Sequence, residues 1–365
     1  MPNADSRPLL GVTVLDLTTL LPGPLATLML AEAGARVVKI ERPGGEDMRR
    51  FHPLRGEGEA AVSVPYALLN RGKEILEIDL KDPAGRARIA DLVRSADVLV
   101  EQFRPGVMER LGLGYPALSA LNPGLVYASI SGYGQTGPRA AEAGHDLNYQ
   151  ALTGILDLSR GPLDRPTLPA AQVADIAGGT LPAVINILLA LIRRTRTGQG
   201  AHLDIAMADG MFMFGVFGLA DGLGGAGWPR SGEGLLTGSL PRYALYATAD
   251  DRLVAVGALE EKFWQAFAEA IGLPQDLRDD RATPEATRSA VASILRGRSA
   301  AAWRPVLAAA DCCATVVATL EEAMADPHVA ARGLFSGRVS LPGGDIPALP
   351  LPIAPVLREP VVSRR

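Results

Sequence analysis

The fold is decided by residues 11–40, which read GVTVLDLTTLLPGPLATLMLAEAGARVVKI. Two runs rich in β-branched residues, Val12–Leu17 and Arg36–Ile40, flank the helical pattern of Pro24–Ala33. A strand, a helix and a second strand in this order are typical of a parallel βαβ unit. Residues 11–40 therefore predict the start of a parallel sheet.

The same alternation continues through the N-terminal half of the chain. Its later strands are mostly apolar runs, as expected where helices cover both faces of a sheet. We therefore predict an α/β fold in which a doubly wound, Rossmann-like parallel sheet forms the large domain. The further strands are expected at Ile75–Leu80, Asp97–Val100, Leu125–Ser131 and His202–Met207, and the further helices at Ala84–Ser95, at Pro105–Leu121, after Gly179 to about Arg193, and at Asp209–Leu219.

A smaller domain is predicted after a glycine-dense segment at residues 221–238. Two short strands, Tyr243–Ala249 and Leu253–Val256, flank an Asp-Asp pair and predict a hairpin. From Pro342 the chain is rich in proline, which favours an extended segment lying across another surface. The expected helices of the smaller domain are Glu260–Ile271, Pro284–Arg296 and Ala300–Ala310. The predicted division is a large domain at 1–220, a linker at 221–238, a small α+β domain at 239–330 and an extended segment at 331–365 that returns to the large domain.

Composition excludes several classes of protein. The 365 residues carry a formal net charge of -4, so no basic surface for nucleic acid or for an anionic membrane is expected. The longest uncharged run, Ile176–Ile192, is interrupted by glycine, proline and asparagine, and we expect a buried core helix there rather than a membrane span. The two cysteines, Cys312 and Cys313, are sequence neighbours, which favours a reducing compartment and predicts the cytoplasm.

Residues 132–137 read GYGQTG and match the dinucleotide-binding pattern G-x-G-x-x-G. That pattern holds a pyrophosphate where a helix opens directly after the glycines. Here Pro138 and the polar residues 139–144 continue as a loop, so binding of a nicotinamide or flavin nucleotide is not expected. The glycines are instead expected to let another ligand approach the backbone closely.

Two side chains are candidates for chemistry. His145 lies in the polar loop GHDLNY at residues 144–149, where it either takes part in catalysis or satisfies loop carbonyls. Asp175 follows an apolar run and precedes a long helix, so it is either the N-cap of that helix or a reactive carboxylate at the helix N-terminus. The other histidines show no metal-ligand spacing, and no metal site is predicted.

Basic residues recur close after the predicted strands. Arg42, Lys81 and Arg104 each follow one of them. The carboxyl ends of parallel strands line the ligand crevice of an open α/β sheet, so these three side chains could converge on phosphate groups. Solvated surface charges are the alternative.

Several short motifs lie along the chain in a fixed order. They are Leu21–Pro24, Glu41–Gly44, Ile78–Lys81, Arg104–Val107, Gly132–Gly137, Gly144–Tyr149, Ala174-Asp175 and Val256–Glu260. In their order and separation these motifs resemble the class III CoA-transferase family, in particular its α-methylacyl-CoA racemase branch, and the resemblance spans nearly the whole chain.

This resemblance implies an interlocked homodimer, with each active site between the large domain of one chain and the small domain of the other. It implies an acyl-CoA substrate with no cofactor besides the coenzyme A that the substrate carries. His145 and Asp175 would be the two acid/base groups, and Glu260 would orient the histidine. The residues that would contact CoA are Arg42, Ile78, Asp79, Leu80, Lys81, Arg104, Gly144, Asp146, Leu147, Asn148 and Tyr149.

Two enzymatic functions are compatible with this resemblance. A racemase acting on a 2-methylacyl-CoA needs one group on each face of the α-carbon, and the N–H groups of the helix after Asp175 would bind the enolate oxygen. A CoA-transferase would instead use Asp175 as the nucleophile that attacks the thioester carbonyl, before CoA passes to another acid. Asp175 alone does not discriminate between the two, whereas His145-Asp146-x-Asn148-Tyr149 together with Glu260 favours the racemase. A non-catalytic acyl-CoA-binding protein would need none of His145, Asp175 and Glu260.

One loop departs from the racemase pattern. Residues 237–242 read TGSLPR where racemases typically carry Gly-Gly-Ala-Pro. Arg242 in this loop could pair with a substrate carboxylate, as a dicarboxylic acyl-CoA or a transferase would require, or it could be a solvated surface charge. The sequence leaves the identity of the acyl group open.

Overall fold

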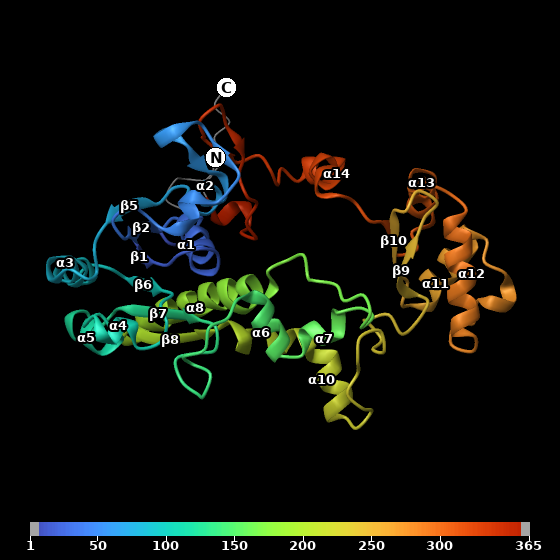
Figure 1. The fold of residues 1–365 in the computed structure, drawn as a ribbon, viewed down its shortest axis with the longest axis horizontal. Coiled ribbons are helices and arrows are strands. Elements are labelled where there is room, and N and C mark those ends of the chain that lie inside the picture. The colour runs from blue at the N-terminus through green and yellow to red at the C-terminus, as the bar shows by residue number, and fades with distance from the viewer. Residues whose placement is uncertain (1–6, 359–365) are drawn as a thin grey trace. The chain divides into compact units, whose positions relative to one another are not determined.

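The computed structural model describes residues 7–358, which form two compact units. Unit 1 consists of the chain up to Thr153, of Ala170–Phe214 and of the chain from Ala330 onward. Unit 2 consists of Gly154–Pro169 and Gly215–Val329. Both units are drawn in Figure 1.

Unit 1 is built around a six-stranded sheet with the strand order β5-β2-β1-β6-β7-β8. All of its pairings are parallel, and Val14 of β1 lies opposite both Val37 of β2 and Val98 of β6. The order reverses between β1 and β6, as in a doubly wound, Rossmann-like sheet. The predicted fold class is confirmed. The strands are β1 (Thr13–Leu17), β2 (Arg36–Glu41), β5 (Glu74–Glu77), β6 (Val98–Glu101), β7 (Val126–Ser131) and β8 (Ala201–Ala206).

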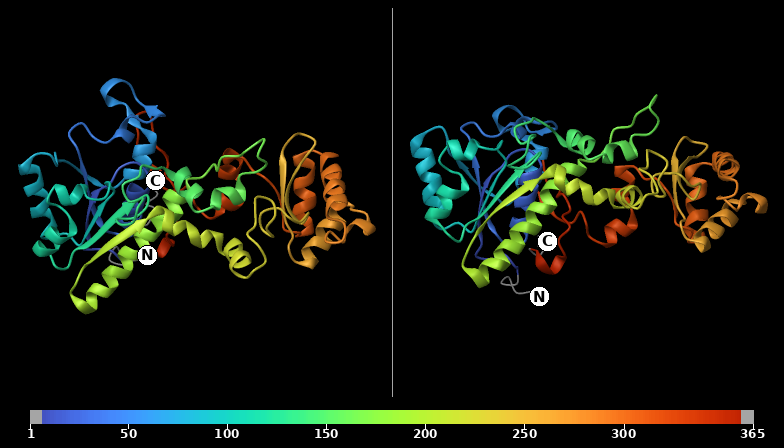
Figure 2. Two further views of the ribbon diagram at one scale, coloured as in Figure 1. Left: turned by 60° about the horizontal axis from the view of Figure 1, so that its bottom comes forward. Right: turned by 90° about the horizontal axis from the view of Figure 1, so that it is seen from below.

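Helices cover both faces of this sheet. On one face α1 and α8 contact each other, and α8 also packs against β7 and β8. On the other face α3 and α5 contribute Ile89 and Leu118 to a core that contains Leu15, Leu99 and Tyr127 of the sheet. Figure 2 shows the cyan helices and the yellow-green α8 on opposite sides of the strands. The helices of unit 1 are α1 (Pro22–Glu32), α2 (Val64–Asn70), α3 (Pro83–Val93), α4 (Val107–Arg110), α5 (Tyr115–Leu121), α6 (Asp146–Leu152), α8 (Leu181–Thr197) and α9 (Met207–Met211).

Three elements differ from the prediction. The single helix expected at Pro105–Leu121 is wrong, because the chain leaves the helical conformation at Gly112, where φ is +73°, and α4 and α5 are separate. The strand expected to reach Leu80 ends at Glu77. The helix expected at Asp209–Leu219 is replaced by α9 and α10 (Val216–Leu223), with a short 3-10 turn between them.

Buried charges hold the loop that follows β1. Lys39 of β2 forms an ion pair of 3.0 Å with Glu46 and donates a hydrogen bond to the carbonyl of Thr18. The second carboxylate oxygen of Glu46 accepts a hydrogen bond from the N–H of Leu20, whose φ is +61°. Lys39 and Glu46 are both buried, so the loss of either one would leave an uncompensated charge. The loop after β1 is thereby fixed in place.

Helix α8 is buried on one face only. Together with the π-helical segment before it, Ala174–Thr197 is the one helix within residues 7–358 that is long and apolar enough to cross a membrane. A single such helix is weak evidence for a span, because core helices have the same composition. Ile187 is buried against unit 1, so the expectation of a buried core helix is correct for that face. The large apolar side chains that α8 exposes are Ile185, Leu189 and Ile192.

Unit 2 contains a three-stranded antiparallel sheet with the order β11-β10-β9. β9 and β10 form the predicted hairpin, in which Val254 lies opposite Tyr246. The three helices predicted for this part of the chain are confirmed, and they bury Trp264, Phe267 and Trp303 in a core of their own. The elements of unit 2 include α7 (Ile155–Ser159), β9 (Tyr243–Ala247), β10 (Leu253–Gly257), α11 (Glu261–Ile271), α12 (Pro284–Arg296), α13 (Ala300–Ala310), β11 (Ala314–Val316) and α14 (Leu320–Ala325).

The units are not continuous in sequence. Residues 154–169 belong to unit 2, although the segments on either side of them belong to unit 1. Helix α10 belongs to unit 2 and ends at Leu223, inside the segment predicted as a linker. The chain from Ala330 onward belongs to unit 1, where Leu351 packs in the same core as Leu28 of α1.

Candidate active site

A hollow of about 510 Å³ lies at the carboxyl-terminal edge of the unit 1 sheet. Its walls come from the segments that follow β1, β6, β7 and β8, and from the π-helical segment Ala174–Thr180. The strand order reverses between β1 and β6, and open α/β sheets bind their ligands at such a position. The lining residues include Thr19, Leu20, Gln102, Arg104, Ser131, Gly144, His145, Asn148, Tyr149, Asp175 and Met207.

His145 is the N-cap residue of α6 and lines this hollow. The side-chain oxygen of Asn148 accepts a hydrogen bond of 3.0 Å from the backbone N–H of His145. The carbonyl of His145 accepts hydrogen bonds from the N–H groups of Asn148 and Tyr149. The main chain of the histidine is therefore fixed at both ends, while the residue itself is exposed.

Glycine residues make room for Tyr149 beside this loop. A Cβ atom on Gly132 would lie 2.5 Å from the ring of Tyr149, and one on Gly144 would lie 2.7 Å from it. The buried Tyr149 donates a hydrogen bond of 2.6 Å from its hydroxyl to the carbonyl of Gly144. The helix that follows residues 132–137 begins only at Asp146, as the loop expected there implies. Gly132, the first glycine of the GxGxxG pattern, thus leaves room for Tyr149 beside the loop that carries His145.

Asp175 lies in the first turn of the π-helical segment Ala174–Thr180, which continues directly into α8. The N-cap of this segment is Val173, so the interpretation of Asp175 as the N-cap is wrong. The Asp175 side chain is partly buried and lines the same hollow as His145. The structure therefore brings the two predicted catalytic residues to one site.

Close packing holds the π-helical segment against α9. A Cβ atom on Gly178 would collide with the backbone carbonyl of Met207, and one on Gly210 would lie 2.6 Å from the carbonyl oxygen of Gly178. Only glycine allows two backbones to approach this closely. Asp175 precedes Gly178 by three residues, so its position depends on this contact.

Burial raises the pKa of Asp175 to about 6, because the charged carboxylate loses hydration. The negative charge of Asp146 raises it as well, since this carboxylate accepts a hydrogen bond of 3.0 Å from the backbone N–H of Asp175. The nearby His145 acts in the opposite direction. A carboxyl group with a pKa of about 6 can both take up and release a proton near neutral pH.

Asparagine in place of Asp146 is expected to lower the pKa of Asp175. The change removes a like charge but keeps a side-chain oxygen that can accept from the Asp175 N–H. Because burial is the larger cause, the pKa should fall only part of the way from about 6 towards 3.8. An NMR titration of ¹³C-labelled aspartate carboxyl groups measures the change, and an unaltered pKa would show that Asp146 has no electrostatic effect.

Four residues predicted to contact CoA line the hollow together with the catalytic pair. They are Arg104, Gly144, Asn148 and Tyr149. Arg104 is exposed, and within the described part of the chain its guanidinium has no hydrogen-bond or ion-pair partner. It is therefore available to an anionic ligand.

The other predicted CoA contacts are not part of the lining. Asp146 is directed at the backbone of Asp175, and Arg42 forms an ion pair of 2.6 Å with a neighbouring aspartate. Arg42 follows β2 and Ile78–Lys81 follows β5, so they stand at the same edge of the sheet as Arg104. Their contact with CoA stays a prediction. The residues of this group are Arg42, Ile78, Asp79, Leu80, Lys81, Asp146 and Leu147.

Glu260 belongs to unit 2, whereas His145 and Asp175 belong to unit 1. It is the N-cap residue of α11, and it is exposed. Within residues 7–358 its carboxylate has no hydrogen-bond or ion-pair partner. The predicted role of Glu260 in orienting the histidine stays a prediction.

The sequence analysis missed several residues that line the hollow. Leu20 follows β1, Gln102 follows β6 and Met207 follows β8. Leu20 and Gln102 lie within three residues of the end of a predicted strand, and Met207 is the last residue of one; nearness to a strand end is the signal that identified Arg104. Uncharged side chains at these positions do not stand out in the sequence, although Gln102 is fixed by a hydrogen bond of 3.0 Å that its side-chain oxygen accepts from the N–H of Gly23.

Comparison with known proteins gives relatives over nearly the full length of the chain. The α-methylacyl-CoA racemase of Homo sapiens is 38% identical over 331 residues, which cover 89% of this chain and 81% of the racemase. The acetyl-CoA:oxalate CoA-transferase of Acetobacter aceti is 35% identical over 361 residues, which cover 94% of this chain and 90% of the transferase. The crystal structure of a CaiB/BaiF family protein from Brucella suis has a TM-score of 0.81 at 30% identity and covers 95% of this chain and 92% of its own.

The relatives thus include enzymes of two activities, racemases and CoA-transferases. The family model described as CoA-transferase family III matches residues 9–358, which include every element of the hollow. The chain therefore belongs to the class III CoA-transferase family.

Proposed function

We propose that this protein is an acyl-CoA racemase that inverts the α-carbon of a 2-methylacyl-CoA. Asp175 and His145 flank the α-carbon, so that one removes the α-proton and the other returns a proton to the opposite face. The intermediate is the enolate of the thioester. The observation that carries the proposal is that both side chains line one hollow.

The pKa of Asp175 supports its use in both directions of a reversible reaction. Inversion in one direction needs the ionised carboxylate, and inversion in the other needs the protonated acid. With a pKa of about 6, protonation of Asp175 at pH 7 costs about 1.4 kcal/mol. At the usual value of 3.8 the same step would cost about 4 kcal/mol. Both protonation states are therefore accessible near neutral pH.

The enolate oxygen needs a hydrogen-bond donor other than the N–H groups of Asp175 and Ile176. The N–H of Asp175 donates to Asp146, and the N–H of Ile176 donates to the carbonyl of Gln172. Both groups have partners within the chain, so these two N–H groups at the start of the helix are not available to the enolate oxygen.

Phosphate recognition is assigned to the basic residues at the sheet edge. Arg104 lines the hollow with an uncommitted guanidinium, and a guanidinium can bind a phosphate through two parallel hydrogen bonds. Lys81 follows β5 at the same edge. The proposed reaction requires no cofactor besides the coenzyme A of the substrate.

The proposal includes a homodimer. Ile185, Leu189 and Ile192 are each more than half exposed and recur at a spacing that places them on one face of α8. A second copy would cover this apolar face, and the resemblance to interlocked dimers of the family assigns Glu260 of one chain to the histidine of the other. Sedimentation analysis of the purified protein tests the oligomeric state.

CoA transfer is the second candidate, favoured by the transferase relatives that match 94% and 97% of this chain at 35% and 34% identity. In that reaction the carboxylate of Asp175 would attack the thioester carbonyl and carry the acyl group while CoA leaves. Most of Asp175 is ionised above pH 6, so its pKa permits this role too.

Deuterium exchange distinguishes the two functions. A racemase should incorporate deuterium from D2O at the α-position of a 2-methylacyl-CoA in the absence of any acceptor acid, and it should convert each enantiomer into the other. Mass spectrometry of the recovered thioester measures both the exchange and, after chiral separation, the inversion. Absence of exchange across several branched acyl groups would reject the racemase.

Two separate assays detect CoA transfer. A transferase should move CoA to an added carboxylic acid, and hydroxylamine or borohydride should trap a modification at Asp175. Transfer without α-exchange would establish the second candidate, and tight binding of acyl-CoA without either reaction would reject both.

A further inference from the structure

Arg242 is buried in unit 2 and committed to partners within the chain. Only 4% of the residue is exposed. Its Nε and Nη2 atoms donate two hydrogen bonds to the carboxylate of Asp280, which is completely buried. The interpretation of Arg242 as a solvated surface charge is therefore wrong. A substrate carboxylate would have to displace Asp280 and leave its charge buried without a partner.

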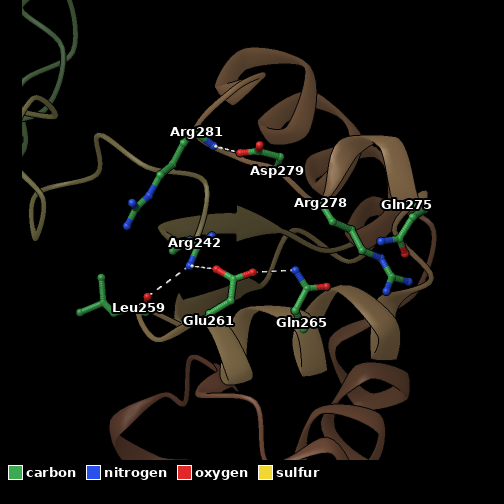
Figure 3. A pocket seen from close by; sticks show the side chains of 8 residues that line it. All are labelled: Arg242, Leu259, Glu261, Gln265, Gln275, Arg278, Asp279 and Arg281. Atoms are coloured by element: carbon green, nitrogen blue, oxygen red, sulfur yellow. Dashed lines mark hydrogen bonds and ion pairs between the residues drawn. The ribbon is translucent and has the colours of Figure 1, made fainter.

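The same guanidinium holds both neighbours of Glu260. Its Nη1 atom donates to the carbonyl of Leu259 at 3.2 Å and to the carboxylate of Glu261 at 3.0 Å. The carbonyl of Arg242 accepts a hydrogen bond of 2.9 Å from the N–H of Ala258. Figure 3 shows the bonds from Arg242 to Leu259 and Glu261 in a hollow of unit 2.

Glu260 itself is fixed in the main chain and free in the side chain. Its carbonyl accepts hydrogen bonds from the N–H groups of Phe263 and Trp264 in the first turn of α11. Its carboxylate is exposed and has no partner within the described part of the chain. The segment therefore presents one uncommitted carboxylate on a backbone that Arg242 holds on both sides.

We infer that Arg242 is a positioning residue for Glu260. It fixes the direction in which the Glu260 carboxylate leaves the chain, and so determines how well this carboxylate accepts a hydrogen bond from the catalytic imidazole. The inference rests on the proposed function, in which Glu260 orients His145.

The physical reason is the narrow geometry of the bond that Glu260 has to make. A hydrogen bond between an N–H and a carboxylate has a donor–acceptor distance of about 2.7–3.2 Å, and it weakens steeply when the angle at the hydrogen falls below about 120°. A displacement of about 1 Å in a positioning group can cost about 10²-fold in rate. A lysine at position 242 keeps the positive charge beside Asp280 but cannot reach Asp280, Leu259 and Glu261 together, because it lacks the planar fork of arginine.

The experiment compares R242K, E260Q and the double variant in the full-length protein. We expect R242K to lower kcat for α-proton exchange about tenfold and to leave KM for the thioester within about twofold. R242K should also displace the pH–rate profile in the same direction as E260Q is expected to displace it, because both variants weaken the contact between the Glu260 carboxylate and the imidazole. In the E260Q background R242K should have no further effect on kcat.

A matched control is R281K. Arg281 lines the same hollow and is exposed, and within residues 7–358 its guanidinium forms no hydrogen bond or ion pair with Arg242, Leu259 or Glu261. The substitution is of the same type, and its kcat and pH profile should equal those of the wild type. A second probe is E261Q, which changes an exposed partner of Arg242 and carries little risk to folding. E261Q should lower kcat about twofold to threefold in the wild-type protein. In the E260Q variant it should cause no further loss of kcat.

The outcomes separate this inference from the proposed function. If E260Q alone changes neither kcat nor the pH profile, the role of Glu260 in the proposed function fails. If E260Q has its effect but R242K lowers kcat equally with and without Glu260, Arg242 acts only through stability and the inference is overturned. If R242K does not fold, E261Q takes its place in this test. An equal loss of kcat from E261Q in the wild-type protein and in the E260Q variant would then overturn the inference.

Discussion

Asparagine in place of Asp175 is expected to abolish inversion of a 2-methylacyl-CoA and to stabilise the fold at the same time. An amide can neither take up nor return the α-proton, and general acid/base groups contribute about 10²–10⁴-fold to rate. Racemisation should therefore fall by at least about 10²-fold, measured by chiral separation of the acyl group after incubation with one enantiomer.

Exchange should survive on one enantiomer only. In D175N the imidazole of His145 is still present, so the enantiomer whose α-proton faces that imidazole can still lose it to solvent. The other enantiomer has lost its base. Deuterium incorporation, followed separately for each enantiomer, should therefore persist in one enantiomer and be lost in the other. Equal loss on both sides would contradict the assignment of Asp175 to one face of the carbon.

The expected gain in stability follows from the raised pKa. Asp175 has a pKa of about 6 in the folded protein against 3.8 for an ordinary aspartate, so the folded state binds more protons between these values. Stability therefore falls as pH rises from about 4 to 6, and above pH 6 the full cost of the ionised carboxylate is present. After allowance for partial exposure, this cost is about 1–2 kcal/mol at pH 7.5.

D175N removes this cost. Thermal denaturation at pH 7.5 should show a Tm about 2–4 °C above the wild type, and the difference should vanish near pH 4. D91N is a matched control, because Asp91 is an exposed aspartate on α3, and it should change Tm little at either pH. A Tm of D175N that is lower than the wild type by the same amount at pH 4 and pH 7.5 would contradict the raised pKa.

The sheet could be predicted from the sequence because its strands carry local signals. Val12–Leu17 and Arg36–Ile40 are short β-branched runs around a helical pattern, and right-handed parallel crossovers leave few topologies for such runs. The break between α4 and α5 was missed, because an isolated glycine such as Gly112 is tolerated inside a helical pattern at a cost of about 1 kcal/mol and need not end the helix.

The sequence identified mainly the ionisable residues of the candidate site. His145, Asp175 and Arg104 stand out as ionisable residues in loops or near strand ends, and all three line the hollow. The π-helical turn at Asp175 was not foreseen; it packs against α9 through the close contact of Gly178 with Met207, which is 29 residues further along the chain. Contacts between distant segments leave no local pattern in the sequence.

The role of Arg242 shows the same limitation of local reasoning. Its loop departs from the pattern of racemases, which suggested a link to the substrate. Its partner is Asp280, which lies 38 residues away and has no distinguishing context in the sequence. Only the folded unit 2 brings the two side chains together, and only then does the arginine become a support for the segment around Glu260.

Alanine in place of His145 is expected to abolish inversion as completely as D175N. The enantiomer that still exchanges its α-proton should be the opposite one. His145 is exposed at the hollow and fixed through its main chain, so removing its imidazole should leave the fold intact. Racemisation should fall by about 10²–10⁴-fold, while the enantiomer whose α-proton faces Asp175 still exchanges with D2O. The pair of variants thus assigns one base to each face of the α-carbon.

The same variant decides between the two functions of the family. CoA transfer through Asp175 needs no second base on the α-carbon, so H145A should retain any transfer activity while it loses inversion. H328A serves as the control, because His328 is an exposed histidine outside the hollow and its loss should change neither reaction. Inversion that survives in H145A with less than about a tenfold loss would mean that Asp175 works with a different partner, and the histidine would then no longer distinguish a racemase from a transferase.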